Sequence, residues 1–332
     1  MVFAVLPEEE FQDLLTIDLP APTNQLIAAV TVANPNSVVV LNTGSAVTMP
    51  WLNQVAAVVE AWYPGQQYGH ALASVLFGLV DPSGRLPVTF PHSLAQVPSA
   101  TLQQYPGILR VEHSEGLATG YRWYDQQGFE PLFPFGFGLS YTTFAFDNLT
   151  IAPSGKGDGA VAVEADVTNT GPRAGTAVAQ LYLGHPSGAG EPPRLLRDFQ
   201  RVDLDPGETA RVPFALDARS LSRWDSAQDR WVAHAGTYTV HVGSSSRDLP
   251  LTGTVTLADT FPTSPATPPP PPLPPPSLTS VLGPVVDAAT CPADVLGPYV
   301  NGALIGGAPT ELATIRTRMC VQFVASSPSA LV

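Results

Sequence analysis

The pattern of apolar residues changes near residue 146, so two different kinds of layer are expected in one chain. Up to about residue 92, short apolar runs such as residues 38–41 alternate with segments of helical spacing. Such alternation is typical of an α/β layer with a largely parallel sheet. From about residue 146 to 257, apolar and polar residues alternate singly, as in residues 161–167, between turns rich in Gly, Pro and Asn. Short strands at this spacing predict a β-sandwich of immunoglobulin or fibronectin type.

Two buried strands and three helices are expected in the first layer. Residues 1–6 and 38–41 are apolar enough for buried strands. The first helix is predicted to begin at Thr23 as its N-cap and to end at residues 34–36, where Asn-Pro-Asn stops it. A second helix is predicted to open at Pro50 and to carry Val55, Val58 and Val59, and a third spans residues 69–77.

The chain divides into four parts by composition. Residues 1–145 form the α/β layer with an irregular connecting segment, and residues 146–257 form the sandwich. Residues 258–277 are rich in proline and predict an extended polyproline linker. The tail, 278–332, has no clear periodicity and contains Cys291 and Cys320, which are free to pair but have neither zinc nor redox spacing.

The charge balance restricts the partners of the chain. A net charge of −13 argues against nucleic acid and against an anionic membrane, because both require a basic surface, whereas it is compatible with a neutral sugar. No apolar run has the roughly 18 residues of a membrane helix. The apolar residues 1–6 lead into Glu8 without a basic residue, which is unlike a signal peptide, and the sequon 148–150 gives weak support for a secreted parent protein.

Several motifs recur in an order and spacing that identify a family. In the first layer and the connecting segment they are residues 38–44 (VVVLNTG), 49–51 (MPW), 60–66 (EAWYPGQ), 82–91 (PSGRLPVTFP), 114–116 (SEG), 120–125 (GYRWYD) and 131–141 (PLFPFGFGLSY). In the sandwich they are residues 167–171 (VTNTG), 180–182 (QLY), 204–208 (LDPGE) and 236–238 (GTY).

These motifs resemble the C-terminal part of the family 3 glycoside hydrolases, the β-glucosidases and β-xylosidases, over residues 2–257. The resemblance implies an α/β sandwich domain followed by a fibronectin type III-like domain. In this family a barrel domain usually precedes both and carries the nucleophilic aspartate and most sugar contacts. Nothing in the 332 residues resembles that barrel, so the chain is expected to begin inside the α/β domain, as in a truncated gene product.

The resemblance also implies a retaining mechanism with two carboxyl groups. One carboxylate attacks the anomeric carbon, and the other protonates the leaving oxygen and then activates water. Members of the family carry the acid/base as the Glu of a Glu-Gly-x-Asp-Arg motif shortly before a Leu-Pro pair. Counting back from Leu19 places Glu10 at that position and predicts it as the catalytic acid/base.

The local sequence departs from the family motif in two places. Phe11 stands where the family has Gly, and Leu14 where it has Arg. Glu8 and Glu9 are therefore alternatives to Glu10, and a solvated acidic loop without catalytic role is a further one. Glu115 lies in another family-like motif but is expected to serve as a structural hydrogen-bond partner. The tryptophans that resemble sugar platforms are expected to belong to the core, namely Trp51, Trp62 and Trp123.

The predicted function is that of a β-glucosidase-type glycosidase acting on β-linked oligosaccharides or aryl glycosides. Neither a metal nor an organic cofactor is implied, because two carboxyl groups suffice for the reaction. Without a nucleophile the chain alone is expected to be inactive. The alternative is a non-catalytic carbohydrate-binding or scaffolding module, with the proline-rich stretch as a tether or a docking peptide.

Overall fold

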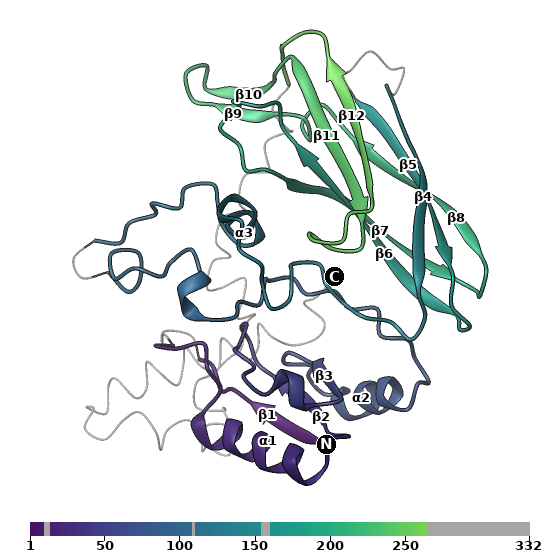
Figure 1. The fold of residues 1–332 in the computed structure, drawn as a ribbon. Coiled ribbons are helices and arrows are strands. Elements are labelled where there is room, and N and C mark those ends of the chain that lie inside the picture. The colour runs from purple at the N-terminus through teal and green to yellow at the C-terminus, as the bar shows by residue number, and fades with distance from the viewer. Residues whose placement is uncertain (10–13, 108–109, 154–159, 264–332) are drawn as a thin grey trace, which may run out of the picture. The chain divides into compact units, whose positions relative to one another are not determined.

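The computed structural model describes residues 1–9, 14–107, 110–153 and 160–263 (Figure 1). In the first layer the elements are β1 (Val2–Val5), α1 (Ala21–Ala33), β2 (Val38–Asn42), β3 (Ala57–Glu60) and α2 (Tyr68–Leu76). The connecting segment holds α3 (Tyr121–Gln127) and two 3-10 turns lie at Leu52–Gln54 and Leu94–Gln96. Among the described residues no helix is long and apolar enough to cross a membrane. The fold class predicted from the sequence, α/β followed by all-β, is confirmed.

The first layer is a three-stranded parallel sheet in the order β1-β2-β3. Val2 pairs with Val39 and Ala4 with Leu41, so the alternate residues of β1 reach the same face as the apolar run of β2. These side chains form a core with Ile27 of α1, which is completely buried. The parallel sheet expected from the alternation of strand and helix is therefore present.

Local structure differs from the sequence prediction at two helices. α1 begins at Ala21, two residues before Thr23, because proline fits the first turn of a helix, where no backbone N–H is needed. Its predicted end at Asn34 is confirmed. The helix predicted from Pro50 is wrong: after a 3-10 turn the chain extends into β3, where the β-branched Val58 pairs with Val39 of the neighbouring strand. The third predicted helix is present as α2.

α3 was not predicted, and two glycines explain its limits. Gly120 at its N-terminal end has φ +57° and Gly128 at its C-terminal end has φ +66°. Both values lie in the left-handed region that glycine adopts without strain. The two glycines therefore set where the helix begins and ends. The short aromatic sequence between them has no helical periodicity, so no helix was predicted there.

The sandwich consists of two packed antiparallel sheets and a smaller one (Figure 1). One sheet contains β4 (Phe144–Pro153), β5 (Val161–Asn169) and β8 (Thr209–Leu216). The other contains β12 (Leu251–Leu257), β11 (Gly236–Gly243), β6 (Gly175–Gly184) and β7 (Leu195–Leu204). The small sheet contains β13 (Phe261–Pro262), β10 (Arg230–Ala233) and β9 (Arg223–Asp225). β13 lies in the stretch that the sequence analysis assigned to the linker; most of that linker, and Cys291 and Cys320 in the tail, lie outside the described residues.

β6 is buried on both faces, unlike its neighbours. Leu181 and Leu183 point into the sandwich core. On the other face, the Gln180 amide donates to the Gly136 carbonyl at 3.0 Å, and the Tyr182 ring meets Tyr121 of α3 edge-on at 5.8 Å. The connecting segment thus covers the outer face of β6, through the hydrogen bond from Gln180 and the ring contact with Tyr182.

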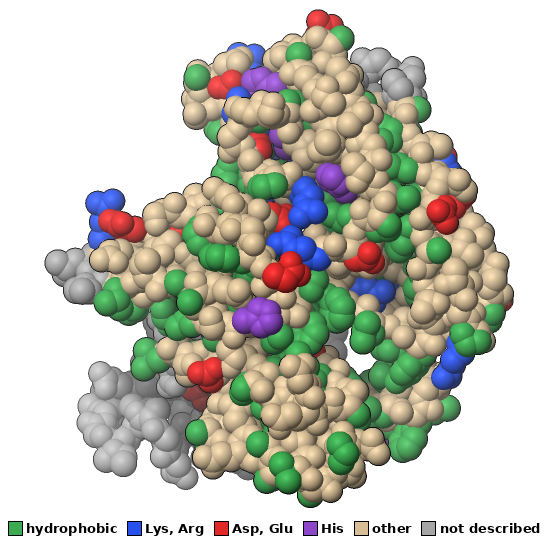
Figure 2. Space-filling model, viewed as in Figure 1, with side chains coloured by type: hydrophobic (Ala, Val, Ile, Leu, Met, Phe, Trp, Pro, Cys, Tyr) green, Lys and Arg blue, Asp and Glu red, His purple; other side chains and the backbone are tan. Residues whose placement is uncertain are grey.

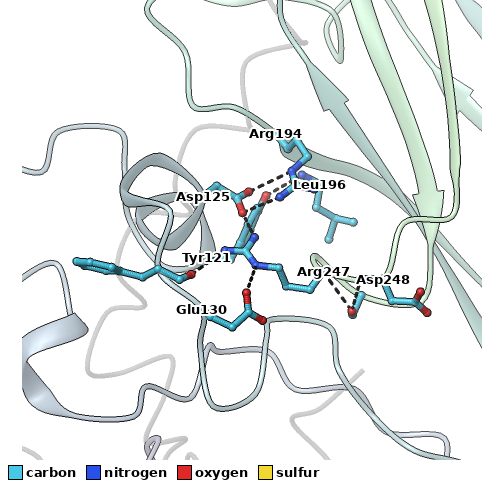
Figure 3. A network of polar contacts seen from close by, with 9 residues as sticks. Tyr121, Asp125, Glu130, Arg194, Leu196, Arg247 and Asp248 are labelled. Atoms are coloured by element: carbon cyan, nitrogen blue, oxygen red, sulfur yellow. Dashed lines mark hydrogen bonds and ion pairs between the residues drawn. The ribbon is translucent and has the colours of Figure 1, made fainter.

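Asp125 of α3 joins the connecting segment to the sandwich (Figure 3). Its carboxylate is 1% exposed and accepts hydrogen bonds from Arg194, at 2.8 Å, and from Arg247. Arg247 also reaches the Phe129 carbonyl and lies 3.7 Å from the Glu130 carboxylate. One buried negative charge is thereby held between two arginines from separate parts of the sandwich.

Replacing Asp125 with Asn should lower the free energy of unfolding by about 3 kcal/mol, because two arginines lose their buried counter-charge. The matched control is Asp203→Asn, since Asp203 pairs with Arg201 at the surface, where the two side chains are 72% and 60% exposed. That control should change stability by less than about 1 kcal/mol. Urea unfolding measures both variants, and equal losses would contradict the role given to Asp125.

Candidate active site

The carboxyl ends of the three parallel strands meet at one edge of the sheet. The chain leaves β1 toward Glu8, β2 toward Thr43 and β3 at Glu60. In open α/β sheets, ligands bind beyond this edge because loops from neighbouring strands converge there. The polar side chains gathered here therefore make up the candidate site.

Glu8 ties the segment after β1 to the loop after β2. Its Oε1 accepts hydrogen bonds from the Gly44 and Ser45 amides, at 3.0 and 3.1 Å, and from the Ser45 hydroxyl at 2.9 Å. The Tyr63 hydroxyl donates to the Leu6 carbonyl at 2.6 Å and holds the same segment from the side of β3. Two anchors thus fix the chain just before Glu10, the residue predicted to be the catalytic acid/base, and one of them is Glu8, an alternative to it.

Glycine is required at position 44 by this arrangement. A Cβ at Gly44 would lie 2.8 Å from Glu8 Oε2 and 2.9 Å from Tyr63 Cε2. Both distances are shorter than normal van der Waals contacts, so a side chain here would displace one anchor or the other. The family-like sequence Asn-Thr-Gly after β2 therefore has a physical explanation.

Glu60 is a half-buried carboxyl whose pKa is raised. Burial raises its pKa from 4.5 to about 7, although hydrogen bonds from the Trp62 and Thr43 backbones oppose the shift. The Thr43 hydroxyl donates to the Ser45 carbonyl at 2.8 Å and lies 3.3 Å from Glu60 Oε2. Thr43 Oγ1 is the donor in both contacts, so its single proton is shared between the Ser45 carbonyl and Glu60 Oε2.

Asn42 and Tyr68 support an unusual backbone conformation beside Glu60. Trp62 has φ +51°, which is rare for a bulky residue. The Asn42 amide donates to the Trp62 carbonyl at 3.1 Å, the Tyr68 hydroxyl donates to Asn42 Oδ1 at 2.8 Å, and the Trp62 amide donates to Glu60 at 2.8 Å. The strained residue is therefore held at both its N–H and its C=O.

A cleft of about 400 Å³ opens beside the loops that follow β1 and β2. The Asp18 carboxylate in its wall accepts hydrogen bonds from the Thr48 and Thr16 hydroxyls, and these bonds, that from Thr48 first, lower the pKa of Asp18. Clefts of this size accommodate small organic ligands. The lining combines hydroxyl, carboxylate, imidazole and apolar groups: Thr16, Ile17, Asp18, Thr48, Met49, Pro50, His92, Ser93, Leu94 and Leu132.

The structure places the glutamates of the sequence analysis differently. Glu10 lies outside the described residues, Glu9 is exposed and Glu8 is the anchor described above. Glu115 accepts a hydrogen bond from Gln104 at 3.3 Å and lies 3.4 Å from His113 Nδ1, away from these loops in the sequence. Glu60 was not singled out, although a glutamate directly at the end of an apolar strand was a visible signal.

The three tryptophans make core or partly buried contacts. Trp51 is 2% exposed and donates to Asn24 at 2.8 Å, so its assignment to the core is confirmed. Trp123 is half-buried and donates to the Gln96 carbonyl at 3.1 Å. Trp62 packs against Phe90 with 6.2 Å between ring centroids. Within the part of the chain that the structure describes, no cluster of His, Cys, Asp and Glu is placed to hold a metal ion.

Two protein-family models match this chain, one in the α/β part and one in the sandwich. Residues 1–141 match the glycosyl hydrolase family 3 C-terminal domain, and residues 177–246 match the fibronectin type III-like domain. The chain carries the C-terminal domain of glycosyl hydrolase family 3. This confirms the resemblance found in the motifs.

Similar family 3 proteins are β-glucosidases. A β-glucosidase of Rhizobium radiobacter is 44% identical over 73% of this chain and 30% of its own length. Thermostable β-glucosidase B of Acetivibrio thermocellus is 40% identical over 87% of this chain and 40% of its own length. The chain thus spans about a third of the length of these relatives.

Solved structures of family 3 agree with this fold. DesR, a β-glucosidase from Streptomyces venezuelae in complex with D-glucose, superposes with a TM-score of 0.75 at 41% identity, over 77% of this chain and 33% of its own. A family 3 β-glucosidase of Bifidobacterium adolescentis gives 0.73 at 40% identity, over 78% and 38%. The family 3 C-terminal domain and the sandwich are therefore present in the same arrangement of secondary structure as in these enzymes.

Replacing Glu60 with Gln should alter the pH dependence of stability. The folded state keeps a proton that the unfolded state has lost, so stability falls as the pH rises from about 4.5 through about 7 and is constant above. Gln preserves the contacts without titrating, so the variant should be more stable than the parent by about 1–2 kcal/mol near pH 8, a value reduced for partial exposure, and similar near pH 5. Urea unfolding at both pH values tests this. The control is Glu9→Gln, at an exposed position, which should leave the stability unchanged at both pH values. A gain in stability of the same size at both pH values in Glu60→Gln would contradict a protonated Glu60.

Proposed function

We propose that this chain forms the C-terminal part of the catalytic apparatus of a retaining β-glucosidase. The observation that carries the proposal is the match over 73–87% of the chain to β-glucosidases at 40–44% identity. The substrate class is a β-linked glucoside, either an oligosaccharide or an aryl glucoside. The carboxyl edge of the sheet, with its two anchors and its cleft, supports a site there.

In this proposal Glu10 is the general acid/base. It follows Glu8 by two residues, and Glu8 is bonded to Gly44 and Ser45. The carboxylic acid protonates the glucosidic oxygen as the bond to the anomeric carbon breaks, and its carboxylate then removes a proton from the attacking water. The nucleophile comes from a barrel domain of the family 3 type, and the described residues form no such barrel.

The isolated chain should not hydrolyse p-nitrophenyl β-D-glucoside above the uncatalysed rate. One carboxylate without a nucleophile cannot form the glycosyl-enzyme intermediate of a retaining enzyme. Release of p-nitrophenol by the purified chain is the measurement. Sustained turnover that is lost in Glu10→Gln would show that this chain supplies both carboxyl groups. That result would contradict the proposal that the nucleophile comes from a barrel domain.

The role of Glu10 is tested in a chimaera in which residues 1–263 replace the matching segment of the Bifidobacterium adolescentis β-glucosidase. Glu10→Gln should lower kcat by about 10²–10⁴-fold on glucosides whose leaving group needs a proton. On 2,4-dinitrophenyl glucoside the first step should be far less affected, because that leaving group departs without protonation.

Glu9→Gln in the same chimaera is the matched control and should leave kcat within about threefold of the parent, because general acid catalysis depends on one positioned carboxyl. A large loss in Glu9→Gln, with little loss in Glu10→Gln, would move the acid/base to Glu9. A loss of kcat/KM, which reports the first step, of the same size on both leaving groups would show that Glu10 acts on structure and not as an acid.

A further inference from the structure

The β9–β10 hairpin exposes a tryptophan at one end of the sandwich (Figure 1). Trp224 on β9 lies opposite Trp231 on β10, and Trp224 is 46% exposed. Within the described parts of the sandwich, 146–153 and 160–263, Phe199 is the one other large hydrophobic residue exposed to this degree. Figure 2 shows hydrophobic side chains beside charged ones at this end of the molecule. Tryptophan is largely buried in most folded proteins, so the place of Trp224 requires an explanation.

Neighbouring groups hold the two indole rings in position. The Trp224 and Trp231 rings meet edge to face, with 5.6 Å between their centroids and 67° between their planes. The Arg219 guanidinium lies over the Trp231 ring, 3.2 Å from its centroid, in a cation–π contact. The Thr263 amide donates to the Trp231 carbonyl at 3.0 Å. Because Trp231 is held by these contacts, the Trp224 ring beside it is ordered before a ligand arrives, which lowers the entropic cost of binding.

The turn that follows Trp224 carries ordered polar groups. Asp225 Oδ1 accepts hydrogen bonds from the Ala227 and Gln228 amides, at 2.9 and 3.1 Å, and Asp225 Oδ2 accepts one from Gln228 Nε2 at 3.0 Å. Arg230 Nε donates to the Gln228 carbonyl at 3.3 Å. Three further groups have no hydrogen-bond partner within the described part of the chain, namely the Trp224 indole N–H, Gln228 Oε1 and the terminal nitrogens of Arg230.

The contact between the two indole rings stabilises the hairpin but does not use the whole of Trp224. Nearly half of this residue stays in contact with water, together with its unpaired N–H. A β-linked glucose unit presents C–H groups on its two faces and hydroxyls around its edge. The C–H groups carry a small positive charge and stack on the negative face of an aromatic ring, while the hydroxyls donate and accept hydrogen bonds.

We propose that the β9–β10 hairpin binds a chain of β-linked glucose units, with one unit stacked on Trp224 and the hydroxyls of the chain bonded to the turn that follows. This surface lies in the part that matches the fibronectin type III-like domain. The choice of a β-linked glucan rests on the proposed function, whereas the sugar platform rests on the contacts of Trp224. A glucan held here stays close to the enzyme between cleavage events, because its next encounter is intramolecular.

Isothermal titration calorimetry on the full chain compares cellohexaose with its α-linked isomer maltohexaose. Cellohexaose should bind saturably and at least about fivefold more tightly, because its flat, extended chain reaches the ring and the turn together. Equal affinities for the two sugars, or no saturable binding of cellohexaose, would overturn the proposal. The measurement involves no turnover, so its failure is separate from a failure of the proposed function, which the kinetics of the chimaera report.

Substitutions assign the binding to Trp224. Trp224→Thr should weaken cellohexaose binding about tenfold or more, because threonine suits a strand but has no flat face. Trp224→Tyr keeps a flat ring and should stay within about fivefold of the parent. Phe199→Ala is the matched control: it removes a 61% exposed aromatic ring from β7 and should change the affinity less than about twofold. Equal weakening in Trp224→Thr and Phe199→Ala, or parental affinity in a folded Trp224→Thr, would overturn the proposal.

The parent chain provides a second test that does not depend on how Trp224→Thr folds. Labelling the five tryptophans with ¹⁵N gives separate indole N–H signals in an NMR spectrum, and the signal missing in Trp224→Tyr is that of Trp224. Cellohexaose should shift this signal saturably and more than the other indole signals. A Trp224 signal that stays in place while calorimetry detects binding would put the sugar elsewhere and would overturn the proposal.

Discussion

The parallel pairing of β1 with β2 determines where this molecule can do chemistry. Because both strands run in the same direction, the chain leaves both at one edge of the sheet, and Glu8 comes within hydrogen-bond distance of Gly44 and Ser45, 36 and 37 residues later in the sequence. An antiparallel hairpin would have placed these groups at opposite ends. The anchored segment after β1 depends on that pairing, and the contacts of Glu60 with Thr43 and of Trp62 with Asn42 depend on the parallel pairing of β2 with β3.

The two glutamates at this edge are held by different contacts. Glu8 Oε1 accepts three hydrogen bonds, from the Gly44 and Ser45 amides and from the Ser45 hydroxyl. Burial raises the pKa of Glu60 to about 7, so this carboxyl holds its proton to a higher pH than an exposed glutamate does. The charge at this edge of the sheet therefore changes near neutral pH, through the titration of Glu60.

The sequence predicted the layers well and the site only in part. Strands β2 and β5 and helix α2 carried strong apolar periodicity, and all three are present. The helix predicted from Pro50 failed because Val58 and Val59 fit a helical spacing as well as a strand, and pairing with β2 decided between the two. The place of Glu60 at the end of an apolar run was visible in the sequence, but the burial that raises its pKa comes from tertiary packing, which no local pattern records.

The two arginine clusters of the sandwich show two ways of holding charge in a folded domain. Around Asp125, Arg194 and Arg247 share one buried carboxylate, so the ion pairs are direct. Around His185, burial lowers the pKa of Arg197, and the carboxylates of Glu191 and Asp217 oppose that shift without a direct ion pair among the described residues. Burial also lowers the pKa of His185 to about 4, so its ring is neutral near pH 7 and adds no positive charge beside Arg197. A direct carboxylate stabilises the first cluster, whereas carboxylates at longer range and a neutral imidazole stabilise the second.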